Sequence, residues 1–282
     1  MVVEVRGKSY HLDTKLRIRW DKLKDGKLSV WDEDRFYIVD GHEGSGKSLY
    51  TIQQAAYIDP TILDDNGDKK LPRICFSVDE FLAAVRTTKS TSTHTKCVIF
   101  DEAFRGMSSK SSLSGTNKKI VEALMEVRQN NLIVFIVSPS FYLLELYPAV
   151  LRSKALFHVV KEKGTRLRYV RIFNYEKKAK LYQLGVRKAW GYPVKTRVKV
   201  RFFGAYPGGD EFEARYRKKK RDSLGSGEDL LKKTHKWKLQ RNSAIKALHE
   251  GGKGYKEISE LMIEAGTKIG VTQIGSIITG EY

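Results

Sequence analysis

The chain has very few cysteines. Its 282 residues include two, Cys75 and Cys97, which lie in apolar stretches and lack the close spacing of metal ligands. This excludes a disulfide-based fold and a cysteine metal centre. We expect two buried, reduced thiols of an intracellular protein.

The sequence also lacks the apolar segments that direct or anchor a protein to a membrane. Its first residues, MVVEVRGKSY, contain no secretory apolar core. Residues 132–151 are apolar, but Glu145 and Pro148 interrupt them, and residues 138–140 (SPS) divide them into strand, turn and helix. We therefore expect no transmembrane segment and a cytoplasmic location.

Acidic residues are scarce in the second half of the chain. Lysine and arginine together number 52 against 33 aspartates and glutamates, a net charge of +19. Residues 1–150 carry 21 basic and 20 acidic side chains, whereas residues 151–282 carry 31 and 13. This asymmetry favours a polyanionic partner, nucleic acid or anionic lipid, over a merely solvated basic surface.

A glycine-rich segment follows the first strongly apolar run. Residues 41–48 read GHEGSGKS, between an expected strand at 36–39 and an expected helix at 49–57. This context predicts a phosphate-binding loop, in which glycines let successive N–H groups point at one anion at the start of a helix. Lys47 is expected to reach the β- and γ-phosphates of ATP and Ser48 to ligate Mg²⁺. The expected phosphate contacts are Gly41, His42, Glu43, Gly44, Ser45, Gly46, Lys47, Ser48 and Leu49.

A second motif consists of two acidic residues after a buried strand. Residues 97–100 (CVIF) precede Asp101 and Glu102, which places both carboxylates at the edge of a sheet where ligands bind. We expect Asp101 to hold Mg²⁺ through water and Glu102 to act as the general base on the attacking water. Ser138 ends the next strand and is expected either to sense the γ-phosphate or simply to form a turn before Pro139.

Strands that alternate with helices predict a three-layer α/β sandwich. The expected strands of the core lie at 36–40, 73–77, 97–100, 132–137 and 155–160, with a helix at 117–128 and a Ser- and Gly-rich loop at 107–117. A glutamate directly after the aspartate indicates the additional-strand, catalytic-glutamate type of P-loop NTPase, whose extra strand lies between the two motif strands. Alternating residues at 166–203 predict a hairpin extension at the edge of the sheet.

Composition divides the chain into four expected parts. Residues 1–34 alternate like strands around an Asp25-Gly26 turn and predict a β element. Residues 35–206 form the core with its β extension, and residues 207–229 a basic flexible linker. Residues 230–282 form a small helical unit, either a helix-turn-helix that binds DNA or a packing pair of helices. The expected nucleic-acid contacts are Arg215, Arg217, Lys218, Lys219, Lys220, Arg221, Gln273 and Ser276.

Three arginines are candidates for one further role, which is to stabilise charge at the nucleotide site of a neighbouring subunit. Arg128 ends a helix just before the strand at 132–137, and we select it over Arg105 and Arg152. Each of the three has an ordinary surface or ion-pair role as its alternative.

Together the segments GHEGSGKS, VIFDEA, EVRQNNLIVFIVSPS and LRSKALFHV resemble ATPases of the HerA/FtsK superfamily over residues 35–175. Within it they are most similar to zonular-occludens-toxin-like proteins of filamentous phages and to viral genome-packaging ATPases. The resemblance implies ATP hydrolysis with Mg²⁺ in an oligomeric ring, often a hexamer, that moves DNA. It also implies a viral or plasmid origin, a capsid or assembly protein as a further partner, and a place in the host cytoplasm or with the virion.

Two departures from that family bear on this interpretation. Many relatives carry Gln at the position of Ser138, and the phage toxin-like proteins carry a membrane helix that we do not find here.

From the motifs, the charge and the resemblance, the expected function is an ATP-hydrolysing motor that translocates or packages DNA. The alternatives are a replication helicase or helicase loader, an ATP-regulated DNA-binding switch, and a membrane-associated phage-assembly ATPase.

Overall fold

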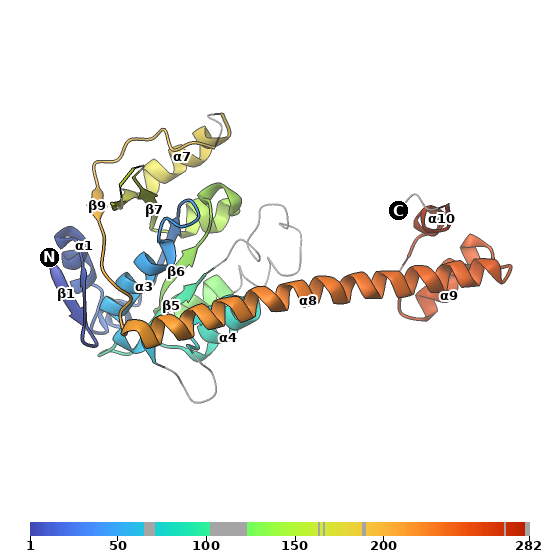
Figure 1. Cartoon of the computed structure of the whole chain (residues 1–282), viewed down its shortest axis with the longest axis horizontal. Coiled ribbons are helices and arrows are strands. Elements are labelled where there is room, and N and C mark those ends of the chain that lie inside the picture. The colour runs from blue at the N-terminus through green and yellow to red at the C-terminus, as the bar shows by residue number, and fades with distance from the viewer. Residues whose placement is uncertain are drawn as a thin grey trace. The chain divides into compact units, whose positions relative to one another are not determined.

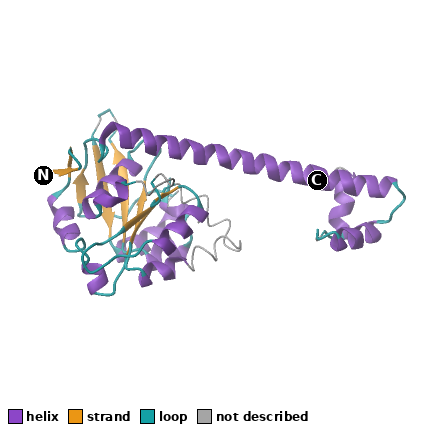
Figure 2. Ribbon diagram, turned by 90° about the horizontal axis from the view of Figure 1, so that it is seen from below, coloured by secondary structure: helices purple, strands orange, loops and turns teal. Residues whose placement is uncertain are grey.

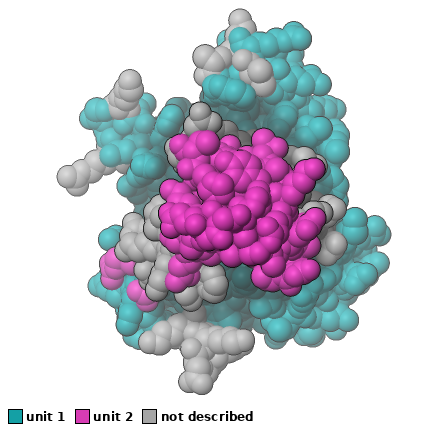
Figure 3. Space-filling model, turned by 90° about the vertical axis from the view of Figure 1, so that its right-hand side faces the viewer, with its two compact units in different colours: residues 1–220 teal, residues 221–282 magenta. Residues whose placement is uncertain are grey.

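The computed structural model describes residues 1–64, 71–101, 123–162, 164–165, 167–187, 190–267 and 269–279, with only the backbone at 186 and 224–239. The chain divides into two compact units, residues 1–220 and 221–282 (Figure 3). Each unit has a hydrophobic core of its own.

Unit 1 is built on a seven-stranded sheet with the strand order β4-β5-β6-β3-β7-β8-β9 (Figure 1). Neighbours from β4 to β7 pair in parallel, whereas β8 and β9 add to the edge in antiparallel fashion. The strand β6 lies between β3 and β5, which confirms the predicted extra strand between the two motif strands. The strands are β3 Arg35–Asp40, β4 Ile74–Cys75, β5 Cys97–Phe100, β6 Ile133–Val137, β7 Ala155–Lys161, β8 Arg168–Phe173 and β9 Lys199–Arg201.

Helices cover both faces of this sheet, because alternate residues of each strand point to opposite sides (Figure 2). On one face, Tyr37 and Val39 of β3 belong to a core that includes residues of α1 and α3. On the other, Phe36 and Ile38 pack with α4, α7 and the helical residues 123–129. The predicted three-layer α/β architecture is confirmed.

The helices of unit 1 connect these strands. They are α1 Thr14–Asp21, α2 Lys27–Val30, α3 Lys47–Ile58, α4 Val78–Thr87 and α7 Tyr175–Arg187, with 3₁₀ turns η1 Pro60–Leu63 and η3 Phe141–Leu143 and the π-helix η4 Tyr147–Arg152. The long helix α8, Gly209–Glu250, begins in unit 1 and continues into unit 2.

The amino-terminal region differs from the predicted β element. Only β1 Val2–Val5 and β2 Lys8–His11 are strands, and the turn at Asp25 and Gly26 joins α1 to α2 instead of closing a hairpin. Leu16 and Trp20 are buried while Ile18 between them is exposed, which is the four-residue spacing of a helix face.

Two further predictions are corrected. The extension at 166–203 contains the helix α7 between β8 and β9, so it is not a simple hairpin. Residues 209–229, predicted as part of a flexible linker, are the start of α8. Phe212 and Tyr216 explain the difference: they lie one helical turn apart and are both buried in the core of unit 1, so packing stabilises a segment that its composition alone disfavours.

Unit 2 is helical, as predicted. It combines the end of α8 with α9 Tyr255–Glu264 and α10 Val271–Thr279 around a small core. A left-handed glycine, Gly266, ends α9 and allows the turn toward α10. The core residues are Ile245, Ile258, Met262, Ile269, Ile274 and Ile277.

Candidate nucleotide site

The loop after β3 has the backbone geometry of an anion-binding turn. Gly41 and Gly46 have positive φ angles of 145° and 96°, and a Cβ atom at Gly41 would lie 2.2 Å from the carbonyl oxygen of Val159. Both positions therefore require glycine. The helix α3 begins at Lys47, so its first N–H groups and the positive end of its dipole face the loop. The Lys47 ammonium donates to the carbonyl oxygens of Gly41, at 2.7 Å, and His42, at 3.0 Å.

Asp101, directly after β5, lies at the same cavity as this loop. The cavity has a volume of about 280 Å³. Its lining residues are Glu43, Gly44, Gly46, Lys47, Ser48, Leu49, Asp101, Tyr206 and Lys220. The structure thus brings together the carboxylate, the lysine and the serine hydroxyl that the two sequence motifs contain.

The combination of this loop, this carboxylate and a strand between β3 and β5 decides the fold of unit 1. The chain has a P-loop NTPase fold. The nucleotide site of such a fold lies at the carboxyl ends of its parallel strands, and here these are the ends of β3 and β5.

Two residues of α8 enter this P-loop site, and neither motif contains them. The Tyr216 hydroxyl donates a hydrogen bond to Asp101. The Lys220 ammonium lies 3.5 Å from the same Asp101 oxygen. Burial and the adjacent Asp101 carboxylate raise the pKa of Tyr216, so its hydroxyl remains protonated and acts as a donor.

The residues expected to hold Mg²⁺ fit that ion in chemistry and position. Ser48 and Asp101 carry oxygen atoms, which Mg²⁺ prefers, and both residues line the cavity beside the P-loop. They therefore lie on one cavity between the loop and β5. Elsewhere in the described part of the chain, no cluster of three or more His, Cys, Asp or Glu residues has the arrangement of a metal site.

A buried network supports the P-loop from below. Asp40, the last residue of β3, is fully buried and accepts hydrogen bonds from the His158 imidazole at 2.9 Å, the Phe141 amide at 2.9 Å and the Tyr192 hydroxyl. The Tyr192 ring stacks on His158 with a centroid distance of 3.7 Å. The network joins β3, β7 and the loop after α7, which are far apart in sequence, so no local pattern predicts it.

Ser138 lies beside this network at the end of β6. Its hydroxyl donates to the Ser140 carbonyl oxygen at 2.9 Å, which corresponds to the turn role. The contact with a γ-phosphate stays a prediction. Glu102, Arg105 and the loop at 107–117 lie outside the described residues.

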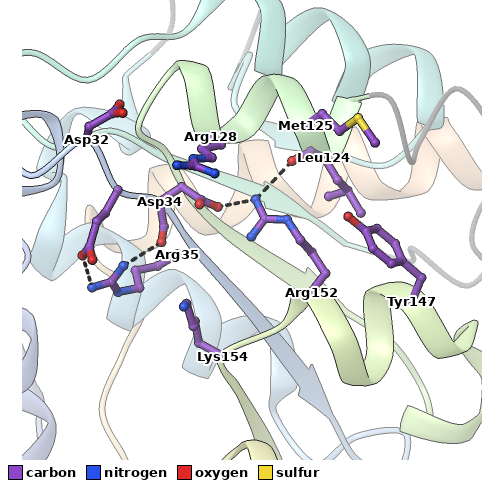
Figure 4. Close-up of a pocket in the computed structure, with 10 residues that line it drawn as sticks. Asp32, Asp34, Arg35, Leu124, Met125, Arg128, Tyr147, Arg152 and Lys154 are labelled. Atoms are coloured by element: carbon purple, nitrogen blue, oxygen red, sulfur yellow. Dashed lines mark hydrogen bonds and ion pairs between the residues drawn. The ribbon is translucent and has the colours of Figure 1, made fainter.

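Arg128 and Arg152 lie at the other end of the sheet (Figure 4). They line a cavity of about 540 Å³ together with Arg35, the first residue of β3, whereas the P-loop follows the last residue of that strand. Arg152 pairs with Asp34 and donates to the Leu124 carbonyl oxygen at 3.1 Å. Neither arginine therefore reaches the nucleotide site of its own chain, and a role of Arg128 at a neighbouring subunit stays a prediction.

Arg168, at the start of β8, is an arginine that contacts the P-loop of its own chain. A Cβ atom at Gly46 would lie 3.4 Å from its Cδ atom and 3.5 Å from its Nε atom. The Nε atom is buried and forms no hydrogen bond within the described part of the chain. Alternating apolar and polar residues predict a strand at β8, but they do not predict which loop the strand contacts. The sequence analysis therefore did not identify Arg168 as a residue of the P-loop site.

The predicted nucleic-acid residues occupy different environments. Lys219 donates to the carbonyl oxygens of Leu71 and Ile74, at 3.0 and 2.8 Å, and Lys220 faces Asp101. Arg217 is exposed and pairs with Glu213 on its own helix. Gln273 and Ser276 lie half-buried on α10.

No family model matches the chain, and no curated protein matches its sequence. Among solved structures, the N-terminal domain of zonular occludens toxin from Neisseria meningitidis aligns with 51% of this chain and 85% of that chain, at 13% identity and a TM-score of 0.34. The genome packaging NTPase B204 from Sulfolobus turreted icosahedral virus 2, in complex with AMPPCP, aligns with 51% and 94%, at 15% identity and 0.34.

A KaiC-like protein from the hyperthermophilic archaeon Pyrococcus horikoshii aligns with 51% of this chain and 80% of that chain, at 12% identity and a TM-score of 0.33. The fold assignment depends on the strand order and loop geometry of the present chain.

Among the described helices, none is both long and apolar enough to cross a membrane.

Proposed function

We propose that the chain binds ATP with Mg²⁺ and hydrolyses it. The observation that carries this proposal is the convergence of Lys47, Ser48 and Asp101 on one cavity beneath a glycine loop. In this assignment the loop N–H groups and Lys47 bind the phosphates, while Ser48 and Asp101 hold Mg²⁺, which neutralises charge that develops on the phosphate oxygens.

Glu102 is our candidate for the general base. It follows Asp101 directly, and its carboxylate takes the proton of the water whose oxygen bonds to the γ-phosphorus. The bond from that phosphorus to the bridging oxygen breaks, and ADP leaves. Arg168 stands against the P-loop and is a candidate for binding the negative charge of the phosphates within one chain.

We further propose that hydrolysis moves DNA through a homo-oligomeric ring, with six subunits as the expected number and Arg128 acting at a subunit contact. A capsid or assembly protein in the host cytoplasm or virion is the expected further partner. The motif resemblance and the basic charge of the chain support this. The distribution of that charge alters where we place the main DNA contact: unit 2, residues 221–282, has 10 basic and 8 acidic residues, whereas residues 151–220 have 21 and 5.

The edge of the sheet provides a surface for a phosphate backbone. Lys195, Arg197, Lys199 and Arg201 are all exposed, and they occupy every second position along β9 and the segment before it. Lys199 and Arg201 share one side of β9, and the residues between the four basic positions are less exposed than they are. We therefore place the electrostatic grip at this basic edge, defined by these four residues, and leave Gln273 and Ser276 as candidates for a supplementary contact.

The experiment that tests the function measures the ATPase rate with and without DNA, alongside mass photometry in ATP. A DNA-stimulated rate and a single discrete oligomer support the motor.

Two variants test the assigned residues. Lys47→Ala should abolish nucleotide binding. Glu102→Gln should retain binding and lose turnover by about 10²–10⁴-fold. Glu126→Gln is the matched control, because Glu126 pairs with Arg86 on the surface. Turnover by Glu102→Gln at the wild-type rate would refute the base assignment.

A DNA-binding switch controlled by ATP is the second candidate. The contact of α8 with Asp101 favours it, because the same helix contributes Ile245 to the core of unit 2. Slow hydrolysis that DNA does not change, together with a sequence-specific footprint, would indicate this function.

A further inference from the structure

The start of α8 is held at the P-loop site by aromatic packing. The Tyr216 ring is only 3% exposed and lies 5.6 Å from the ring of Phe76 and 5.7 Å from that of Tyr206. Phe212, one turn earlier, is fully buried. These rings fix the first turns of α8. Packing in the core therefore sets the position of the Tyr216 hydroxyl.

The polar ends of Tyr216 and Lys220 point to the same place. They are four residues apart on α8 and therefore share one face of the helix. The Tyr216 hydroxyl donates to Asp101, and the Lys220 ammonium lies 3.5 Å from the same Asp101 oxygen. The two side chains thus supply a hydrogen-bond donor and a positive charge to a carboxylate assigned to Mg²⁺.

A bound magnesium ion would use the same carboxylate in a different way. If Asp101 holds the ion through water, the metal-bound water would need the Asp101 oxygen that now accepts from Tyr216. The charge of the ion would also replace the contribution of Lys220 to Asp101. The hydroxyl of Tyr216 and a metal-bound water are therefore alternatives at one Asp101 oxygen.

We propose that Tyr216 and Lys220 belong to the nucleotide site as a latch, defined by these two residues, which holds Asp101 until magnesium nucleotide displaces it. This inference rests on the proposed function, because it presupposes that Mg²⁺ and ATP bind at Ser48 and Asp101. Displacement of the latch changes the first turns of α8, the helix that also contributes to the core of unit 2. Nucleotide binding is thereby coupled to a helix shared by both units.

The test compares Tyr216→Phe with Tyr57→Phe in the full-length chain. Phenylalanine keeps the ring packing and removes only the hydroxyl. Tyr57 is the matched control, because its hydroxyl donates to a different carboxylate, Asp21, at 2.7 Å. The affinity for a fluorescent ATP analogue is measured in Mg²⁺ and in EDTA. We expect Tyr216→Phe to bind about tenfold more tightly in Mg²⁺, with a smaller change in EDTA, because one hydrogen bond to a charged group no longer competes.

A second measurement follows the backbone directly. In the wild-type protein, addition of the analogue with Mg²⁺ should increase amide hydrogen exchange in residues 209–220, whereas a purely structural contact would leave this exchange unchanged or lower. If the wild type binds no magnesium nucleotide, the proposed function fails. If it binds, but Tyr216→Phe behaves like Tyr57→Phe or binds more weakly and exchange does not increase, the latch is refuted while the function stands.

Discussion

At the scale of single residues, Lys47 and Asp101 of the P-loop site each have a partner within the chain. Lys47 donates to carbonyl oxygens of its own loop, and Asp101 accepts from Tyr216. Buried charges are stable only when such partners are available. The same residues that we assign to ATP thus have alternative partners within the chain, and any ligand must replace them.

Lys178 of α7 allows a prediction on pH. It is fully buried, and its ammonium donates to the carbonyl oxygens of Val150 and Ser153 at 2.7 and 2.6 Å, which satisfies the end of η4. Burial lowers its pKa from 10.5 to about 8. Between these values the unfolded chain binds a proton that the folded chain does not, so the free energy of unfolding rises with pH across this window.

Urea denaturation of the wild type and Lys178→Met, at pH 7.5 and pH 10, tests this. The stability difference between them should shift by about 2 kcal/mol in favour of the wild type at the higher pH. Equal pH dependence of the two proteins would contradict the lowered pKa. Comparing the two removes the contribution of every other titrating group they share.

At the scale of elements, the spacing of buried residues identifies helices that the composition obscured. In α1 the apolar residues Leu16, Ile18 and Trp20 alternate as in a strand. Only the first and last are buried, and Trp20 packs against Tyr37 and Phe135 of the sheet, with centroid distances of 5.4 and 6.2 Å. The sheet face, which lies far away in sequence, therefore selects the helix.

This packing predicts a large effect for one tryptophan and a small one for another. Trp20 is fully buried, and its indole donates to the Gln54 amide oxygen at 2.8 Å, whereas Trp31 is 51% exposed. Trp20→Ala should lower the free energy of unfolding by about 3–5 kcal/mol. Trp31→Ala should change it by less than about 0.5 kcal/mol. Urea denaturation followed by circular dichroism measures both, and similar losses would show that α1 is not part of the core.

At the scale of the whole molecule, the positive charge is distributed unevenly between and within the two units. The excess of positive charge belongs to residues 151–220 of unit 1, not to the helical unit 2. An interface with six to ten phosphate contacts would lose about three to five decades of affinity between 50 and 200 mM salt. The proposed basic edge should therefore dominate the salt dependence of DNA binding.

Replacement of Lys195, Arg197, Lys199 and Arg201 by alanine tests that assignment. Loss of four phosphate contacts should reduce the slope of log affinity against log salt by about 3 to 4, as measured by fluorescence anisotropy. Alanine at Lys246 and Lys256, which are exposed in unit 2, is the control and should change the slope by less. A flat salt dependence in the wild type, or a larger loss in the control, would move the DNA contact away from the edge.

The sequence by itself determined the features that depend on neighbouring residues. These are the loop at 41–48, the strands β3, β5, β6 and β7, and the helices of unit 2. Steric and hydrophobic patterns act over a few residues, so the sequence shows them directly. The catalytic assignments of Glu102 and Arg128 stay predictions.

Only the tertiary structure decided which distant segments meet. It placed Tyr216 and Lys220 on Asp101, Arg168 against Gly46, His158 on Asp40, and Arg128 at the opposite end of the sheet. Such contacts join residues with no shared local pattern, so they follow from strand order and helix packing. The physical reason is that packing energy is gained across the sheet, where separation along the chain has no bearing on distance.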